Sequence, residues 1–245
     1  MADELTERGT GGTARTVTET AALIEDVAAG CRRFLSECGP VKLAPFMSSW
    51  PQTAARRAVL PTPLSAVRWL SMGPLDRDPS AADLLRSIQR AAPHFAWRQS
   101  YTEAEVGAGF LDCYAWTEIV GLEGPVASER IACGILLLGP GTHYPVHRHE
   151  AEEVYVPLCG DAQWQQGDGE WRHHAPGTVV LHASGEPHAM RTGSAPLVAV
   201  YVWRSSNLAQ VSRLDQSCAE PAAARSATPV PGHEADASTA VGRRP

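Results

Sequence analysis

The sequence has no hydrophobic run long enough to cross a membrane. Its longest apolar stretches are ILLLG and LVAVYV, whereas a spanning helix needs roughly 18 apolar residues. The opening segment, MADELTERGTGGTART, is polar and acidic and does not resemble the apolar core of a secretory signal. We therefore expect a chain that does not insert into membranes.

The sequence also lacks any stretch rich in lysine and arginine. Its 21 Lys and Arg residues are outnumbered by 27 Asp and Glu residues, and the formal net charge is −6. Proteins that bind nucleic acids or anionic lipids by charge usually present a basic patch. We therefore expect neither nucleic acid nor a membrane surface among the partners.

Paired cysteines are missing as well. The six cysteines are scattered without a CxxC pair, and in a chain of 245 residues this pattern favours free thiols over a disulfide framework. Cys31 and Cys38 would share a helix face about 10 Å apart, too far for a disulfide. Free thiols are typical of a reducing compartment, so we predict a cytoplasmic protein.

The first part of the chain reads as a helical region. We predict disorder over 1–16, where Gly, Thr and charge dominate. A helical region over 17–94 follows, with one helix over 17–37 and another over 81–91, because apolar residues recur there at helical spacing. The Pro-rich segment between these two helices predicts loops with one short helix near 51–59.

The pattern changes near residue 95. Short segments rich in Val, Tyr, Trp and Leu alternate there with Gly and Pro turns, which indicates a mainly β fold, a sandwich or barrel over 95–205. The expected strands are FAWRQSY, FLDCYAWTEIV, RIACGILLL, EEVYVPL, AQWQQ, TVVLH and LVAVYVW. The Pro-, Ala- and Ser-rich residues 215–245 predict a disordered tail.

One segment of the expected barrel, HYPVHRHEAEEVY, is dense in ionisable groups. Alternate residues of a strand face the same side, so four odd-numbered residues are expected on one face: His147, His149, Glu153 and Tyr155. The opposite face of the strand would carry Val146, Val154 and Val156. Imidazoles and a carboxylate that converge in an interior are costly without compensation, which a divalent metal supplies.

These residues resemble the two motifs of the cupin superfamily. The first, G-x5-H-x-H-x3/4-E-x6-G, is matched at every spaced position by Gly141, His147, His149, Glu153 and Gly160. The second, G-x5-P-x-G-x2-H-x3-N, is matched in its two glycines and histidine by Gly177, Gly185 and His188. Ala183 replaces its proline, and Thr192 replaces its asparagine.

The resemblance implies a small antiparallel β-barrel of the jelly-roll type, preceded by the helical region. It also implies one divalent metal ion bound by four residues: His147, His149, Glu153 and His188. Fe, Mn, Zn and Ni all accept such ligands, so the sequence does not name the metal. His182 competes with His188 as fourth ligand, because strand parity does not separate residues an even number apart. The motif spacing favours His188.

Within the cupins, the pattern Y-x2-H-x-H-x3-E-x-Y, followed by a late tryptophan, resembles the cupin-type dimethylsulfoniopropionate lyases. Tyr144, Tyr155 and Trp203 carry this likeness together with the motif residues. The N-terminal helical region most resembles the DddL/DddQ kind. The likeness covers roughly residues 80–205, and it is weak in the first 75 residues and the tail.

The resemblance implies cleavage of a small zwitterionic sulfonium substrate to dimethyl sulfide and acrylate. In such a β-elimination a base removes the proton α to the carboxylate, which a metal makes more acidic by binding that carboxylate. Tyr155 is the expected general base. The sulfonium would be attracted by aromatic faces, for which Tyr144 and Trp203 are the main candidates, with Tyr201 and Trp164 as further ones.

Two other functions are compatible with the same ligands. A cupin dioxygenase or isomerase would use the same metal set, with iron for oxygen chemistry. A non-catalytic, ligand-sensing cupin would need a partner domain, and the first 95 residues show no basic recognition helix. Because cupins often pair, a homodimer is also expected.

Overall fold

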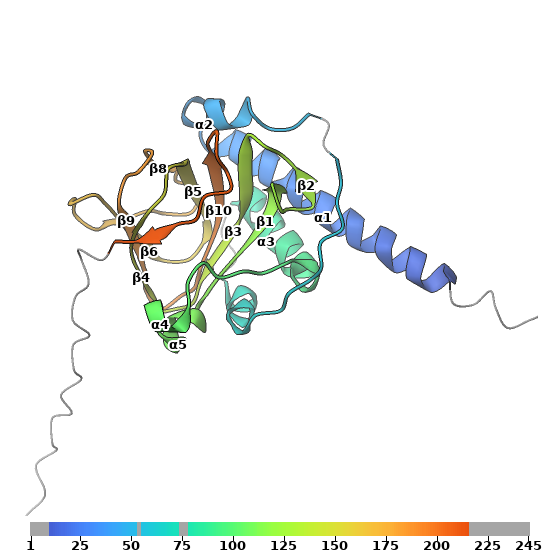
Figure 1. Cartoon of the computed structure of the whole chain (residues 1–245), viewed down its shortest axis with the longest axis horizontal. Helices are drawn as coiled ribbons and strands as arrows, with labels where there is room; N and C mark the ends of the chain where they lie inside the picture. The colour runs from blue at the N-terminus through green and yellow to red at the C-terminus, as the bar shows by residue number, and fades with distance from the viewer. Residues whose placement is uncertain (1–9, 53–54, 74–77, 216–245) are drawn as a thin grey trace, which may run out of the picture.

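The computed structural model describes residues 10–52, 55–73 and 78–215. Its centre is a six-stranded sheet in the order β2-β1-β3-β10-β5-β8 (Figure 1). All neighbouring strands in this sheet are antiparallel except β1 and β2. The strands are β1 (Tyr114–Gly121), β2 (Val126–Ala127), β3 (Ile131–Leu138), β5 (Glu152–Cys159), β8 (Val180–His182) and β10 (Leu197–Arg204).

A five-stranded antiparallel sheet faces the first one, in the order β11-β4-β9-β6-β7. Its strands are β4 (His143–Arg148), β6 (Ala162–Gln166), β7 (Arg172–His173), β9 (His188–Thr192) and β11 (Arg213–Leu214). The mainly β, two-sheet architecture confirms the predicted fold class. β4, which carries the first histidine of the motif, lies in the segment treated as extended in the sequence analysis, whereas β9, which carries the last, was not among the predicted strands.

Alternation along the strands creates two separate cores. On β1, Tyr114 and Trp116 face the space between the sheets, whereas Ala115 and Ile119 pack with the helices behind the six-stranded sheet. Val154 and Val156 of β5 also belong to the helix-side core, as predicted. The aromatic side chains of the strands thus point into the barrel together with some aliphatic ones, such as Leu136 and Leu138, and the helix-side face of the sheet is aliphatic.

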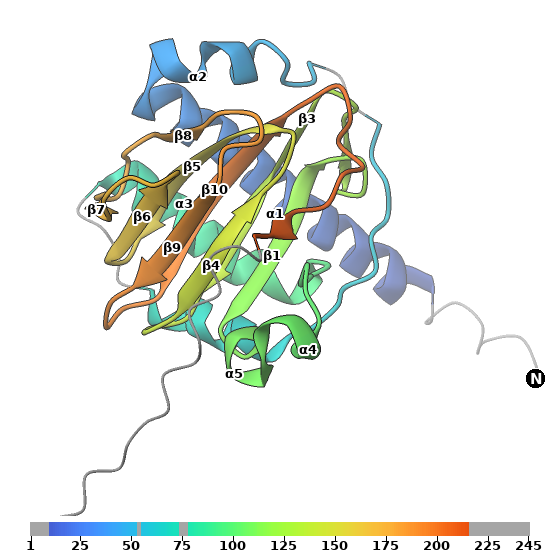
Figure 2. The ribbon, with the colours of Figure 1, turned by 60° about the vertical axis from the view of Figure 1, so that its left-hand side comes forward.

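The helices cover the outer face of the six-stranded sheet. Figure 2 shows α1 (Thr10–Cys38) and α3 (Pro79–Ala91) behind the sheets. The two helices pack on each other and contact β1 and β5. Asp78 caps α3, since its carboxylate accepts a hydrogen bond from the backbone N–H of Ser80 at 2.9 Å. The helix predicted over 81–91 is therefore present, with its expected start signal.

The N-terminal helix begins earlier than predicted. α1 starts at Thr10 instead of Val17, within the segment expected to be disordered. The glycines there disfavour a helix, but extending a helix already nucleated by its packed turns costs little. Residues 1–9, and the predicted tail from 216 onward, lie outside the described residues.

The Pro-rich region is more helical than its sequence indicates. α2 (Pro40–Met47) begins at the proline expected to keep the chain non-helical after α1, because proline is well tolerated in the first turn of a helix. A 3-10 helix, η1 (Ser65–Met72), follows later. The short helix predicted near 51–59 is wrong for the described residues of that range, which are irregular apart from one β-bridge residue.

Three small helices precede β1, and only the last of them overlaps a predicted strand, at 110–111. They are η2 (Ala92–His94), α4 (Glu103–Val106) and α5 (Ala108–Leu111). Segment 95–101 forms only isolated bridges to Thr62 and Trp116. In the described residues, no helix is long and apolar enough to cross a bilayer.

Candidate metal centre and active site

A β-bulge in β4 sets the geometry of the first motif histidine. Tyr144 pairs with Met190 and His147 with His188, and the register shifts between these two pairs. Tyr144 and His147 therefore both point inward, although three positions separate them. Their rings stack, with centroids 3.9 Å apart and planes inclined by 7°. Simple strand parity would have placed them on opposite faces.

Three of the four predicted ligands form a compact cluster. His149, Glu153 and His188 each offer a ligand atom, and these atoms all lie within 4.8 Å of one another. Glu153 Oε2 lies 2.7 Å from His149 Nε2 and 3.3 Å from His188 Nε2. All three side chains are buried. The fourth predicted ligand, His147, lies beside this group, with its ring centroid 4.1 Å from that of His188.

Backbone carbonyls set the tautomers of the histidines. In His147, His149 and His188, Nδ1 lies 2.9–3.1 Å from a carbonyl oxygen, which can only accept a hydrogen bond, so each Nδ1 donates. The carbonyls belong to Pro145, Ala151 and Glu186 respectively. Each Nε2 is thereby left to offer its lone pair.

The donor set fits a divalent cation. His188 Nε2 is buried and makes no hydrogen bond with acceptable geometry, and such an orphaned polar atom is costly without a partner. Imidazole Nε2 atoms and a carboxylate oxygen are ligands for Fe, Mn, Zn or Ni. A cation in this position would satisfy His188 and neutralise the charge of Glu153.

The competing histidine, His182, is oriented differently. It stacks on His188, with centroids 4.0 Å apart, and its Nδ1 lies 3.3 Å from the side-chain amide nitrogen of Gln166. That nitrogen donates, so Nδ1 of His182 accepts and the proton sits on Nε2. Burial, followed by the charge of His188, lowers the pKa of His182 to about 3. His182 therefore supports the His188 ring and is not part of the compact cluster.

The electrostatics of the cluster centre on an ion pair. Burial raises the pKa of Glu153, but the charge of His149, a hydrogen bond from His149 and the nearby His188 outweigh it, and the pKa falls well below its usual value. Burial lowers the pKa of His149, yet Glu153 outweighs this and raises it. Because His147 is buried and lies close to His188, its pKa falls well below the usual value. The contact between His149 and Glu153 is the interaction that a bound cation would replace.

Tyr155 lies against the same carboxylate. It is 5% exposed and sits two residues after Glu153 on β5. Burial raises the pKa of Tyr155 well above its ordinary value, and the charge of Glu153 and a hydrogen bond to that carboxylate add to the shift. Tyr155 is therefore a phenol as long as Glu153 keeps its negative charge. A cation that neutralises Glu153 reverses the second and third of these effects.

Trp203 is tied to the cluster on two sides. Its indole N–H donates a hydrogen bond of 2.6 Å to Glu153 Oε1. Its ring lies over His149, with centroids 4.2 Å apart and planes inclined by 31°. The strand register explains this contact, because Trp203 of β10 pairs directly with Glu153 of β5. No sequence pattern indicated this contact.

These groups open into one large cavity of about 920 Å³. Six of the residues singled out from the sequence line it: Tyr144, His147, His149, Glu153, Tyr155 and Trp203. Tyr201 also lines the cavity, whereas Trp164 does not and packs instead against His174. Sequence reasoning missed Trp116, Glu118 and the segment 208–212, which line the cavity as well. The strand YAWTEIV already contained the first two in alternation.

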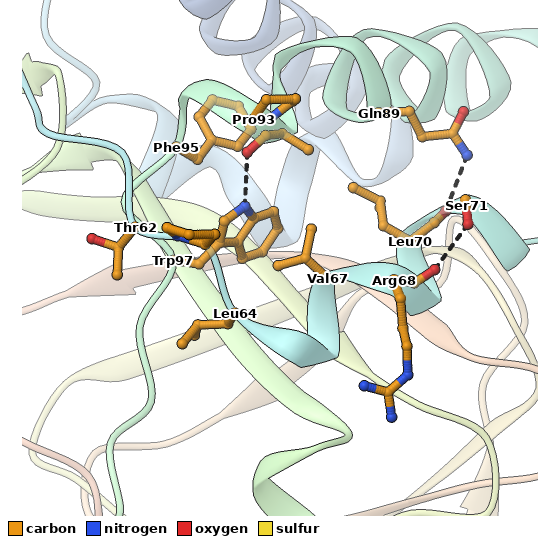
Figure 3. Close-up of a pocket in the computed structure, with 12 residues that line it drawn as sticks. Thr62, Leu64, Val67, Arg68, Leu70, Ser71, Gln89, Pro93, Phe95 and Trp97 are labelled. Carbon is orange, nitrogen blue, oxygen red and sulfur yellow. Dashed lines mark hydrogen bonds between the residues drawn. The ribbon is translucent and has the colours of Figure 1, made fainter.

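A second hollow, of about 500 Å³, lies beside η1 and η2 (Figure 3). Its lining is mostly apolar, and three of its polar side chains are engaged with backbone carbonyls. Trp97 donates to Ala92, Gln89 to Leu70 and Ser71 to Arg68. This hollow therefore lacks the converging polar groups of an active site.

Two facing antiparallel sheets with a buried histidine and glutamate cluster between them define a cupin. Known proteins place the chain more closely. The family model for dimethylsulfoniopropionate lyase matches residues 52–199. The lyase DddQ of Ruegeria pomeroyi is 35% identical over 152 residues, 60% of this chain and 76% of the relative. The putative lyase DddL of Cereibacter sphaeroides is 34% identical over 123 residues, 49% of this chain and 50% of the relative.

Solved structures of dimethylsulfoniopropionate lyases are also similar to this chain. A chain from the crystal structures of the dimethylsulfoniopropionate lyases RdDddP and RnDddQII superposes with a TM-score of 0.73, 28% identity and coverage of 80% of this chain and 100% of that one. The structure of DddQ from Ruegeria pomeroyi gives a TM-score of 0.65 at 28% identity, over 76% and 96%. The chain belongs to the dimethylsulfoniopropionate lyase family, whose members are carbon–sulfur lyases. This confirms the predicted resemblance.

Proposed function

We propose that this chain cleaves dimethylsulfoniopropionate to dimethyl sulfide and acrylate by β-elimination at the described cluster. The observation that carries the proposal is the cluster of His149, Glu153 and His188 beside a cavity lined by His149, Glu153 and Tyr155, in a chain that belongs to this lyase family. A base removes the proton α to the carboxylate, the electron pair forms the C=C bond, and the C–S bond breaks to release neutral sulfide.

His147, His149, Glu153 and His188 would hold one divalent metal ion. Three of these residues already offer atoms within 4.8 Å of one another, and the Nδ1 hydrogen bonds leave every Nε2 available. When bound, the ion supplies Lewis-acid stabilisation of enolate-like charge on the substrate carboxylate and favours the Tyr155 phenolate over the phenol. His182 takes no ligand role and packs behind His188.

Tyr155 would accept the proton at its phenolic oxygen. It lines the cavity beside Glu153, which is the neighbourhood that a substrate carboxylate would occupy. Tyr144 and Trp203 would form part of the aromatic wall. Because Tyr144 stacks on His147 and its hydroxyl lies 3.0 Å from that of Tyr101, its ring is held firmly in place.

The test is to incubate purified, metal-analysed protein with dimethylsulfoniopropionate and to measure dimethyl sulfide and acrylate. Absence of both products from metal-loaded protein would overturn the lyase proposal. Tyr155→Phe should keep its metal and lose turnover. Retained turnover would remove Tyr155 from the base role, and loss of the metal would make Tyr155 a ligand.

Tyr101→Phe is the matched control for that variant. Tyr101 is also a buried tyrosine with a hydrogen-bonded hydroxyl, but it bonds to Tyr144 and Ser212 and does not line the cavity. We expect this variant to retain turnover at saturating substrate, with any effect confined to KM, because Tyr101 holds Tyr144 but does not itself line the cavity. The predicted homodimer and the predicted cytoplasmic location remain predictions. Among the described residues, Cys31, Cys38, Cys113 and Cys133 form no disulfide, in keeping with the pattern expected from the sequence.

A further inference from the structure

A second acidic group faces the cavity at a distance from the histidine cluster. Glu118 of β1 lines it together with Trp116 and Tyr201. The strand register places Glu118 opposite Gly134, Gly134 opposite Tyr201, and Tyr201 opposite Tyr155. Neighbouring strands lie about 4.8 Å apart, so the backbones of Glu118 and Tyr155 are separated by about 14 Å along one row of the sheet.

An aromatic surface connects the two ends of that row. A Cβ on Gly134 would come within 2.8 Å of ring atoms of Tyr201, so the tyrosine ring lies over the bare glycine. Trp116 meets Tyr201 edge to face, with centroids 6.4 Å apart and planes inclined by 82°. A cationic group bound between the histidine cluster and Glu118 would contact these aromatic faces.

The carboxylate of Glu118 keeps one oxygen available. Its Oε1 accepts two hydrogen bonds, from the backbone N–H groups of Glu123 at 2.6 Å and Gly124 at 2.7 Å. Within the described chain, Oε2 accepts none. The nearby cation, Arg98, forms an ion pair with Glu123. Burial raises the pKa of Glu118 above its ordinary value, and the two backbone N–H groups and the charge of Arg98, which also lines the cavity, offset this only in part.

We propose that Glu118, with Tyr201 and Trp116, forms the end of the pocket that recognises the positive charge of the substrate. This inference rests on the proposed function, because the carboxylate of the same zwitterion would lie at the histidine cluster. Ordinary bond lengths put the two charged ends of the substrate about 5 Å apart. The remaining separation would be closed by side chains that lean along the row into the cavity that both ends line.

Glu118 also has a purely structural use, because its Oε1 ties down the turn at 123–124. Glu118→Gln separates this use from charge recognition. The glutamine carbonyl oxygen accepts the same two backbone hydrogen bonds, and only the negative charge is lost. The charge-matched control is Glu129→Gln, an exposed residue that does not line the cavity.

The experiment compares two unreactive substrate analogues by calorimetric titration of the metal-loaded protein. One is β-alanine betaine, which carries a trimethylammonium cation. The other is its neutral carbon isostere, with a tert-butyl group in place of the cation. Wild type and Glu129→Gln should bind the cationic analogue more tightly. Glu118→Gln should lose about tenfold in that preference, as expected for one charge contact across a partly solvated cavity, while its Kd for the neutral analogue stays unchanged.

Two results would overturn the inference. One is equal binding of both analogues by wild type, and the other is an unchanged preference in Glu118→Gln. Neither readout requires turnover, so failure of the lyase assay and failure of this inference are distinguishable. An active wild-type enzyme whose Glu118→Gln variant keeps the full preference would refute the role of Glu118 alone.

Discussion

The indole N–H of Trp203 provides the sharpest test of how the metal centre is organised. Its hydrogen bond to Glu153 Oε1 directs Oε2 toward the Nε2 atoms of His149 and His188. Trp203→Phe keeps an aromatic ring but removes the donor, which leaves a buried carboxylate oxygen unpaired and the carboxylate free to turn. We therefore expect weaker metal binding.

The size of the effect follows from the bond that is lost. A hydrogen bond to a charged group contributes about 1.5–3 kcal/mol, and each 1.4 kcal/mol is a factor of ten. Metal affinity should therefore fall roughly 10- to 100-fold, the range usual for the loss of a hydrogen bond to a metal ligand. Competition with a chromogenic chelator, followed by metal analysis of the dialysed protein, measures it.

Trp164→Phe is the matched control. Trp164 is 1% exposed, and in the described structure its indole N–H has no hydrogen-bond partner. Its replacement should leave metal affinity unchanged. If Trp203→Phe also leaves metal affinity unchanged and raises only the KM for substrate, Trp203 does not position the metal ligand Glu153. It then acts only as part of the substrate wall.

Three further predictions concern stability. Gly134→Ala should destabilise the fold by at least about 1–3 kcal/mol, because the added Cβ overlaps the carbonyl oxygen of Thr117. The measurement is a lower Tm. The control is Gly109→Ala, which should not lower the Tm because no atom lies within 4 Å of its added Cβ. In the folded protein the pKa of His182 is about 3, whereas an ordinary histidine has a pKa of 6.5. Below pH 6.5 the unfolded state therefore binds more protons than the folded state, and the metal-free protein loses stability as pH falls. In urea denaturation between pH 6 and 4.5, His182→Asn should flatten that slope by up to about 1.4 kcal/mol per pH unit, and an unchanged slope would contradict a neutral His182. Asp78→Ala should cost about 1 kcal/mol through loss of the α3 cap, measured by the same denaturation; no loss would show that the cap is dispensable.

Much of the fold was predictable because its signals are local. The short apolar runs in RIACGILLL and LVAVYVW mark β3 and β10, and the Asp78 cap with the following proline marks α3. α2 was missed because proline after α1 was interpreted only as a breaker, although it also suits the first turn of a new helix. The strand expected at 95–101 failed for a different reason: it has strand-like residues but only isolated bridge partners in the described fold.

The candidate site was also predicted only in part from the sequence. Motif spacing selected His149, Glu153 and His188, and the structure brings these three together. Strand parity, by contrast, gave no reason for Tyr144 to share a face with His147, because the bulge in β4 is set by pairing with β9. Parity also did not separate His182 from His188. The orientation of their rings separates them, and it depends on Gln166 and on the carbonyl of Glu186.

The sequence by itself determined the kinds of ligand atoms, their spacing and the family to which the chain belongs, because a motif is a property of consecutive residues. Only the tertiary structure decided that Trp203 holds the carboxylate of Glu153 and that Glu118 faces the same cavity as Tyr155. These relations join strands that are distant along the chain. They arise from the register between neighbouring strands, which hydrogen bonds and side-chain packing establish only when the sheet is assembled.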